Sequence, residues 1–474
     1  MKVLIVLCLI FNVNLSFSQE VNETFWEKMT RYHDIIFSLT MGSLDSRGLS
    51  LDSLFKPNVP SYSLVSKSIN KQIAKAGCKD TGCDTYPLDF SNSVNSHLSF
   101  AKSFRILPNT ESFELREKLI REAKKSIYVL VWAVYDDETG FQFQNQLLDA
   151  LAINPSLDIK IITDGNIVNF RGRSVLKNLE TLSHGKIKVM RWKSLKYKAN
   201  GSHRKMFIVD QEHVIVGGMN IGNEYSHLAT LIKWRDLDLY INGKSSGTSA
   251  ERQFIEIWNK QIEEFPGLKK KIDLMALSDF QQEPESGDIP VTFVDQHPGS
   301  AIKDYYHNIH TAVVKLFRDA KETIDIENAY FIMDPIIKEE LKKVIKRGVK
   351  VRIFTNSDKS IDEPIVSTPV MKSARDAIEM GAKVYLKKKL TVHSKYMIVD
   401  GKISMIGSFN FHPRSLHFDA ENVAVIFDKT LARELTEHFD NGICEEYHFQ
   451  NAKDIKVDWT FMGLIMNSFY FDFL

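Results

Sequence analysis

A histidine–lysine motif occurs twice in this chain, 190 residues apart, with its internal spacing unchanged. Lysine follows histidine by two positions, aspartate by seven and asparagine by seventeen. The two copies consist of His203, Lys205, Asp210 and Asn220, and of His393, Lys395, Asp400 and Asn410. One such pattern can arise by chance, but two copies with matched downstream residues indicate a duplicated half-site. We therefore expect the chain to fold as two related halves.

Each motif has the local pattern of a buried strand that ends in a turn. Residues two apart on a strand project from the same face, so each motif histidine should project together with its lysine. The segments MFIV and YMIV that follow are apolar, which fits strands buried on both faces. Asp400-Gly401 predicts a tight hairpin, and the small residues at 217–218 and 407–408 would allow a ligand to approach the backbone closely.

The two halves also correspond outside the motifs. A strand-like segment, a helical segment and another apolar strand precede each motif, as IYVLVWAVYDD, FQFQNQLLDALA and DIKIITDG in the first half. This alternation predicts an α/β half with a largely parallel sheet and helices on both faces. We expect an internal pseudo-dimer in which the two histidine–lysine strands face each other across a pseudo-twofold axis.

The converging side chains indicate a phosphodiester substrate. A histidine, a lysine and an asparagine from each half would provide cations and amide donors for the phosphoryl oxygens. Two imidazoles would serve the covalent and acid–base steps.

With its paired HxKxxxxD signature, the chain resembles the phospholipase D superfamily over roughly residues 100–470. The bacterial cardiolipin synthase branch is the most similar, on GGMNIGNEY at 217–225, RDLDL at 235–239, TNSDKSIDEP at 355–364 and GSFNFHPRS at 407–415. The resemblance implies two α/β/α sandwich halves that form an internal pseudo-dimer with one active site at their interface.

The resemblance also implies a role for each motif residue. His203 would attack phosphorus and form a phosphohistidine, while His393 would protonate the leaving alcohol and then deprotonate the acceptor. Lys205, Lys395, Asn220 and Asn410 would hold the phosphoryl oxygens. This chemistry requires no metal and no cofactor, because lysine and imidazolium supply the positive charge.

A carboxylate on the far ring nitrogen would fix the tautomer of each histidine. By position, we predict Glu421 for His393 and Asp236 for His203, with Asp238 as the rival for the latter. Asp210 and Asp400 lie at strand ends, so we predict that they support turns. Four histidines without a counterpart in the other half are expected at the surface or behind the site: His213, His227, His412 and His417. His412 stands where relatives often carry an acid, and this difference is expected to alter the choice of acceptor.

Composition and charge divide the 474 residues further. Residues 1–18 read as a secretory signal peptide, residues 101–275 as the first half, residues 276–290 as a linker and residues 291–474 as the second half. The extension at 19–100 carries no motif and could be a lid, a membrane-facing cap or a packing arm. Its Cys78 and Cys83 are spaced for a small disulfide loop in an oxidising compartment, and the chain is expected to be exported, periplasmic or secreted.

The acceptor of the transferred group is the main question that the motifs leave open. Phosphatidyl transfer to an alcohol is favoured, with a phospholipid substrate and a membrane surface as partners. Hydrolysis by a secreted phospholipase D, or nuclease or other phosphodiesterase activity, are the alternatives. The formal net charge of +1 weighs against a dedicated nucleic-acid binder, which usually carries a basic excess.

Overall fold

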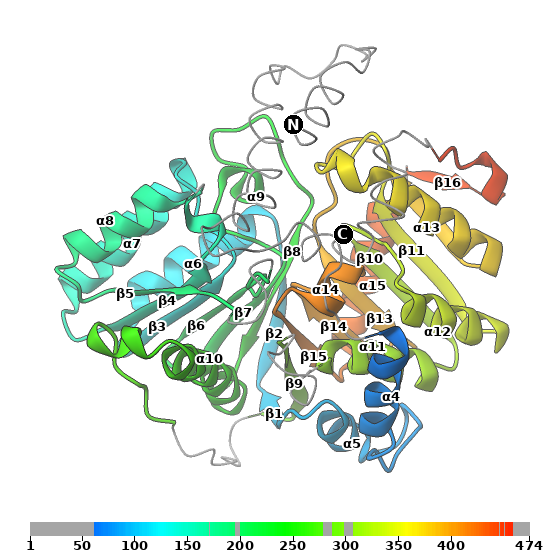
Figure 1. Cartoon of the computed structure of the whole chain (residues 1–474), viewed down its shortest axis with the longest axis horizontal. Coiled ribbons are helices and arrows are strands. Elements are labelled where there is room, and N and C mark those ends of the chain that lie inside the picture. Colours follow the sequence, from blue (N-terminus) through cyan, green and yellow to red (C-terminus); the bar gives the residue numbers. More distant parts are fainter. Residues whose placement is uncertain are drawn as a thin grey trace, which may run out of the picture.

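A computed structural model describes residues 61–169, 171–194, 200–277, 287–297, 307–444, 446–449 and 451–457. Within them the chain forms two mixed α/β halves, each with one sheet, placed side by side in Figure 1. The predicted signal peptide, residues 19–60 of the extension and most of the predicted linker lie outside the described residues. None of the described helices is long and apolar enough to cross a membrane.

The first half is built on a seven-stranded sheet. In spatial order its strands are β2 (Ser103–Pro108), β8 (Leu237–Asn242), β7 (His213–Gly217), β6 (Met206–Val209), β3 (Ser126–Val131), β4 (Asp158–Asp164) and β5 (Lys188–Trp192). The helical segments are α6 (Thr110–Glu122), α7 (Glu138–Ile153), η1 (Ile167–Asn169), α8 (Arg173–Leu182), α9 (Asn223–Ser226), α10 (Lys244–Glu264) and η2 (Pro266–Lys270).

The second half repeats this plan on a nine-stranded sheet. Its spatial order is β1 (Leu98–Ala101), β9 (Ile289–Gln296), β15 (Glu421–Ile426), β14 (Ile403–Gly407), β13 (Lys395–Val399), β10 (Thr323–Asn328), β11 (Lys350–Asn356), β12 (Lys383–Lys387) and β16 (Tyr447–Phe449). The helical segments are α11 (Asn308–Asp319), α12 (Pro335–Lys346), η4 (Pro364–Val366), α13 (Ser367–Met380), α14 (Pro413–His417), α15 (Lys429–Ile443) and η5 (Ala452–Asp454).

Both sheets are mixed, so the prediction of a largely parallel sheet was wrong. Among the described strands, β3, β4 and β5 pair in parallel, as do β10, β11 and β12, and the other pairs are antiparallel. A tight turn joins the motif strand to the next strand, β6 to β7 and β13 to β14, and such strands must run antiparallel. After a longer connection that contains α9 or α14, β8 and β15 pair antiparallel with β7 and β14. The apolar motif segments are strands, as expected.

A shared hydrophobic core joins the two halves. Alternate side chains of each central strand point to opposite faces, so Phe207 and Val209 of β6 pack outward under α6, α7 and α8. Met206 and Ile208 point inward and meet Tyr396 and Ile398 of β13 in one cluster, together with residues of α10 and α15. The outer face of the second sheet packs separately against α11, α12 and α13. Beside the site, the interface between the halves is therefore packed like a domain interior.

The described part of the N-terminal extension packs on the second half. Helix α4 (Tyr62–Ile73) contributes Val65 and Ile69 to a cluster with Val314 of α11. Helix α5 (Tyr86–Ser93) joins the outer core of the second half, and β1 extends that sheet beside β9. Among the three roles considered from the sequence, this part of the extension is a packing arm. The chain enters the first half only at β2.

The structure has Cys78 and Cys83 as free cysteines whose side chains hydrogen-bond to each other, so the disulfide between them stays a prediction. The Cys78 thiol donates to the carbonyl of Asp80 at 3.3 Å. The Cys83 thiol lies 3.3 Å from the hydroxyl of Thr85. The turn between them thus satisfies each thiol locally.

Candidate active site

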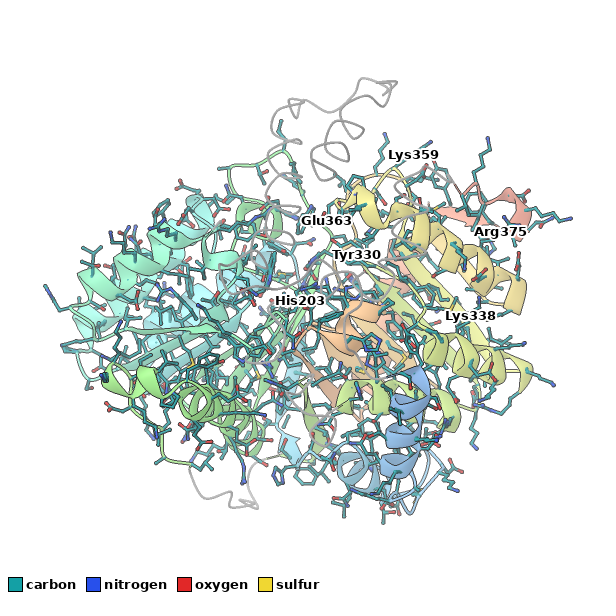
Figure 2. All side chains as sticks on the ribbon, viewed as in Figure 1. His203, Tyr330, Lys338, Lys359, Glu363 and Arg375 are labelled. Carbon is teal, nitrogen blue, oxygen red and sulfur yellow. The ribbon has the colours of Figure 1, made fainter. Side chains whose placement is uncertain are left out.

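The motif histidines lie in extended segments that lead directly into the motif strands. His203 and Lys205 precede β6, and His393 precedes β13, whose first residue is Lys395. Each lysine ammonium donates a hydrogen bond to the carbonyl of its own histidine, at 2.8 Å in the first half. Figure 2 shows His203 in the middle of the molecule, between the two halves. The histidine and lysine of each motif are thus held together.

Backbone hydrogen bonds across the interface fix the two segments relative to each other. His203 N–H donates to Ala420 O at 2.8 Å, and His393 N–H donates to Arg235 O at 2.7 Å. Matching parallel bridges join Ser202 to Ala420 and Arg235 to Val392. Each motif segment therefore pairs with the chain just before the corresponding strand of the opposite half, β15 or β8, as a pseudo-twofold axis requires.

The two carboxylates are paired with the histidines in the opposite way from the prediction. Glu421 Oε2 lies 3.0 Å from Nδ1 of His203, and Asp236 Oδ2 lies 2.6 Å from Nδ1 of His393. The reason is the interface pairing, which presents each carboxylate to the other half's motif. The rival Asp238 binds Arg116 at 2.7 Å and Ser112 at 2.6 Å instead. Each histidine is thus oriented by the half to which it does not belong.

The carboxylates leave the second ring nitrogen of each histidine available. A buried carboxylate accepts the proton on Nδ1, so Nε2 carries the lone pair. Glu421 also accepts hydrogen bonds from Ser408 at 2.6 Å and Ser415 at 2.8 Å, and Asp236 accepts one from the amide of Leu237 at 2.7 Å. These bonds hold both carboxylates in place.

Burial perturbs every ionisable group of the cluster. It lowers the pKa of Lys205 to about 7 and that of Lys395 to about 8, and for Lys205 the charge of Lys395 acts in the same direction. Burial, followed by the neighbouring lysine of the same motif, lowers the pKa of both histidines well below its usual value. Burial also raises the pKa of Asp236 to about 6 and that of Glu421 to about 7. An entering phosphate anion would relieve this crowding of buried cations.

The two motif asparagines each have a buried side-chain oxygen without a hydrogen-bond partner in the described part of the chain. The other amide atom of Asn220 lies 2.7 Å from the hydroxyl of Tyr225. Asn220 and Asn410 follow β7 and β14, where Gly217 and Gly407 allow the strands to pass close to their neighbours. Buried polar atoms are normally paired, so each of these oxygens can accept a hydrogen bond from a donor on a ligand.

The motif aspartates lie away from the histidines, at the far ends of the motif strands. Asp210 accepts hydrogen bonds from the amides of Lys124, Lys125 and Ser126 at 2.7–3.0 Å. Asp400 accepts equivalent bonds from residues 321–323 at 2.7–3.1 Å. Each carboxylate thereby fixes the turn before a central parallel strand.

Comparison with known proteins places the chain in a family. The family described as "Cardiolipin synthase, PLD-like domain" matches residues 117–258 and 313–443, one segment in each half. This chain belongs to the cardiolipin synthase-like family of the phospholipase D superfamily. The two matched segments coincide with the two halves of the fold.

Sequence relatives of this phospholipase D-like protein are cardiolipin synthases. The Oceanobacillus iheyensis cardiolipin synthase is 26% identical over 68% of this chain and 64% of its own length. The Listeria welshimeri cardiolipin synthase is 27% identical over 71% of this chain and 68% of its own length. The chain thus spans somewhat less than two thirds of the first of these relatives.

A solved structure has the same fold. The phosphatidylserine synthase of Haemophilus influenzae superposes with a TM-score of 0.62 at 17% sequence identity. The match covers 78% of this chain and 93% of that protein. At this identity the likeness shows the phospholipase D fold.

Aromatic rings enclose the site of this phospholipase D-like protein. Trp234 stacks on His393 with ring centroids 4.9 Å apart, and Tyr225 meets the same ring edge-on at 5.2 Å. Trp132 lies 6.0 Å from His203. The His393 side chain is 6% exposed and that of His203 is 17% exposed. The aromatic wall limits access of water, more strictly around His393 than around His203.

His412, which the sequence placed at the surface or behind the site, is buried beside the cap of α14 and acts electrostatically on the site. It is the N-cap of α14, and its Nδ1 accepts the amide hydrogen of Ser415 at 3.0 Å. Burial lowers its pKa well below the usual value, and the charges of His203 and Arg414 act in the same direction. His412 is therefore neutral and carries its proton on Nε2. The useful sequence signal was a histidine in the capping position, two residues after the motif asparagine.

The other three histidines have structural contacts. His213 pairs with the hydroxyl of Tyr240 at 2.8 Å, and His227 lies 2.8 Å from the carbonyl of Trp234. His417 is fully buried against Tyr62 of the packing arm, and so it is not at the surface.

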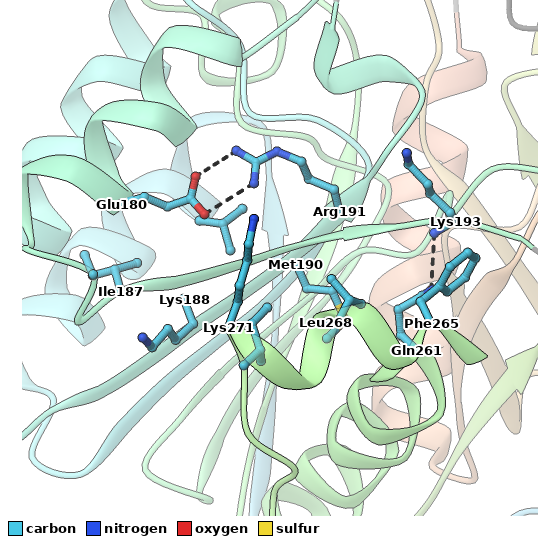
Figure 3. A pocket seen from close by; sticks show the side chains of 13 residues that line it. Glu180, Ile187, Lys188, Met190, Arg191, Lys193, Gln261, Phe265, Leu268 and Lys271 are labelled. Atoms are coloured by element: carbon cyan, nitrogen blue, oxygen red, sulfur yellow. Dashed lines mark hydrogen bonds and ion pairs between the residues drawn. The ribbon is translucent and has the colours of Figure 1, made fainter. Parts of the chain in front are cut away.

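A separate cavity of about 420 Å³ lies at the outer edge of the first half, between β5 and η2. Figure 3 shows its lining, which includes Lys188, Lys271 and the ion pair between Arg191 and Glu180. None of the motif residues lines this cavity. It is thus distinct from the histidine site.

Proposed function

We propose that this protein transfers phosphatidyl groups between alcohols through a phosphohistidine intermediate, as a cardiolipin synthase-like enzyme. The observation that carries the proposal is the crossed arrangement of two histidine–carboxylate pairs at one buried interface, with a lysine from each half beside them. Two imidazoles, each with a free Nε2, can divide nucleophilic attack and proton transfer between them.

In the first step, Nε2 of His203 attacks the phosphorus of a phospholipid phosphodiester and forms an N–P bond. The bond from phosphorus to the headgroup oxygen breaks, and protonated His393 gives its Nε2 proton to the departing alcohol. In the second step, neutral His393 removes the proton of the acceptor hydroxyl, whose oxygen attacks the phosphohistidine and releases His203. The products are the exchanged phosphodiester and the freed alcohol.

Binding of the substrate anion would prepare the charges for this sequence. In the free site burial keeps His393 neutral near pH 7. A phosphodiester anion between the two lysines favours the charged form of every nearby base. Protonation of His393 would therefore accompany substrate binding, and Lys205 and Lys395 would stabilise the five-coordinate phosphorus with Asn220 and Asn410.

Transfer is favoured over hydrolysis by the enclosure of the site. Trp234 and Tyr225 cover His393, the group that must deprotonate the acceptor, and so restrict water at the second step. The names of the matched relatives support the same choice. The nearly neutral net charge of +1 lends less support to a nuclease.

Product analysis tests the proposal. The protein is incubated without added metal with phosphatidylglycerol vesicles, with and without phosphatidylethanolamine and glycerol. Cardiolipin together with released glycerol is the expected result. Phosphatidic acid as the sole product would instead identify a hydrolase. A complete lack of lipid products, with cleavage of single-stranded DNA, would identify a nuclease.

A further inference from the structure

Two exposed leucines lie on loops that lead into the site from opposite halves. Leu231, in the loop between α9 and β8, has 91% of its surface exposed, and Leu390, just before the second motif, has 57% exposed. The first loop rises above the sheets where the two halves meet (Figure 1). Large apolar side chains in this position cost free energy in water and contribute nothing to the core.

Both leucines are close in sequence to residues of the site. Leu231 is three residues before Trp234, which stacks on His393, and Leu390 is three residues before His393 itself. Three extended residues span at most roughly 10 Å. The two chains then pair, because Arg235 N–H donates to Thr391 O at 2.8 Å. The loops therefore form neighbouring parts of one rim at the site.

The backbone of the rim is held in conformations that its residues seldom adopt. Leu390 has φ of 57° and Ala229 has φ of 48°. The left-handed region is unfavourable for alanine and leucine. Strain of this kind that persists at a site indicates a function beyond folding.

The rim also carries positive charge. Lys233 follows Leu231 by two residues, and Lys388 and Lys389 directly precede Leu390; all three lysines are exposed. Lys387 of the same run is paired with Glu446 and faces the protein. Protruding leucines with lysines on either side complement an anionic lipid surface, which accepts apolar side chains below its charged headgroups.

We infer that residues 228–233 and 388–390 form a docking rim that seats the protein on an anionic phospholipid bilayer, with the site facing the lipid. The inference deepens the proposed function, on which its choice of a lipid partner rests. Leu231 and Leu390 enter the acyl–headgroup boundary, and the three lysines contact lipid phosphates. In this orientation the rim places lipid next to the segments that lead to Trp234 and His393.

Vesicle sedimentation of the full-length protein tests the rim. Vesicles contain phosphatidylglycerol and phosphatidylcholine, or phosphatidylcholine alone. Leu231→Asp is expected to lower the partition coefficient on anionic vesicles about tenfold or more, since one leucine leaves the lipid and a charge replaces it. The matched control is Ile153→Asp, because Ile153 is 76% exposed at the end of α7 on the outer face of the first half.

A second pair of variants tests the charge. Lys388→Gln with Lys389→Gln should weaken binding about fivefold per lysine on anionic vesicles and leave binding to neutral vesicles unchanged. Lys269→Gln with Lys270→Gln removes the same charge from an exposed segment of the first half and should change binding by less than twofold, roughly the effect of distant exposed charge. Thermal melting verifies that each variant is folded.

If Leu231→Asp and Ile153→Asp bound anionic vesicles equally well, the proposal of a docking rim would be wrong. So would a Leu231→Asp variant that binds vesicles normally but loses affinity for a single-stranded oligonucleotide, because the loop would then serve nucleic acid. The failure of the proposed function is distinct: the wild-type protein would bind vesicles through Leu231 and yet form no lipid product.

Discussion

The crossed pairing of carboxylates and histidines predicts which carboxylate variant has a reaction rate that depends on the leaving group of the substrate. Asp236 holds Nδ1 of His393 at 2.6 Å, and His393 is the proposed proton donor to the departing alcohol. Asp236→Asn keeps the size of the side chain but removes the charge that stabilises the imidazolium. A substrate whose leaving group departs as a stable anion needs no proton. Asp236→Asn should therefore retain most of its activity toward such a substrate.

The expected size of the effect follows from the contact. A buried hydrogen bond to a charged partner contributes about 1.5–3 kcal/mol, and each 1.36 kcal/mol is about tenfold in rate. Asp236→Asn should thus slow headgroup release from phosphatidylglycerol about 10- to 150-fold. With a p-nitrophenyl phosphodiester of the same lipid the loss should fall to about threefold or less, because general acid catalysis no longer contributes.

Glu421→Gln is the matched comparison. Glu421 holds Nδ1 of His203, the proposed nucleophile, at 3.0 Å. This variant should slow both substrates by similar factors, about 10-fold or more, because attack on phosphorus is common to them. Rapid-quench measurement of alcohol release gives one rate. Trapping of the phosphohistidine in denaturant at neutral to mildly alkaline pH, because its N–P bond is acid-labile, gives the other.

The reverse pattern would refute the reasoning. If Glu421→Gln were rescued by the activated leaving group and Asp236→Asn were not, His203 would be the proton donor and the assignment of roles would be exchanged. If neither variant showed any dependence on the leaving group, no histidine would act as general acid. Circular dichroism of both variants excludes unfolding as the cause.

Three further predictions concern the charges of the site. Lys205→Met should abolish turnover and yet raise the free energy of unfolding by about 1–3 kcal/mol, since a buried cation is replaced by an apolar side chain of similar length. Urea unfolding measures this change, and the surface control Lys269→Met should alter stability by less than about 0.5 kcal/mol. A Lys205→Met variant less stable than the wild type would show that burial of the cation does not destabilise the fold. The kcat/KM for phosphatidylglycerol should fall as the pH rises through 7 to 8, because Lys205 and Lys395 lose their protons at about pH 7 and about pH 8 in the free site. The corresponding fall in kcat should occur at higher pH, since bound phosphate raises the pKa of both lysines. A kcat/KM that rises over this range would exclude the lysines as phosphate ligands. His412→Ala should shift the products from transfer toward phosphatidic acid by severalfold, because a fixed Nε2–H donor beside His203 is lost; an unchanged product ratio in lipid chromatography would remove His412 from acceptor binding.

The sequence was sufficient to identify the parts of the site that depend on spacing along the chain. The duplicated motif located the histidines, the lysines and the asparagines, because their relative positions are set within one strand–turn–strand unit. The role of Asp210 and Asp400 at turns could be reasoned in the same way, since each lies one strand length from its histidine.

Features that depend on contacts between the halves could not be predicted in the same way. Asp236 lies 33 residues after His203 and 157 before His393, yet it binds His393. The pairing follows from the interface ladder at Arg235 and Val392, which no local pattern encodes. The packing arm is another such case. Helices α4 and α5 come before the first half in the sequence, yet they pack on α11 of the second half.

The crossed carboxylates make the site a property of the interface rather than of either half. A half that was folded alone would have a histidine without its carboxylate, an open face on the shared core and one lysine instead of two. The halves are also unequal, since Trp234 stacks on His393 and holds it at 6% exposure while His203 remains 17% exposed. A nucleophile must reach phosphorus, whereas a proton shuttle benefits from shielding from water. Duplication therefore supplied two equivalent imidazoles, and the unequal aromatic wall gave each of them a different environment.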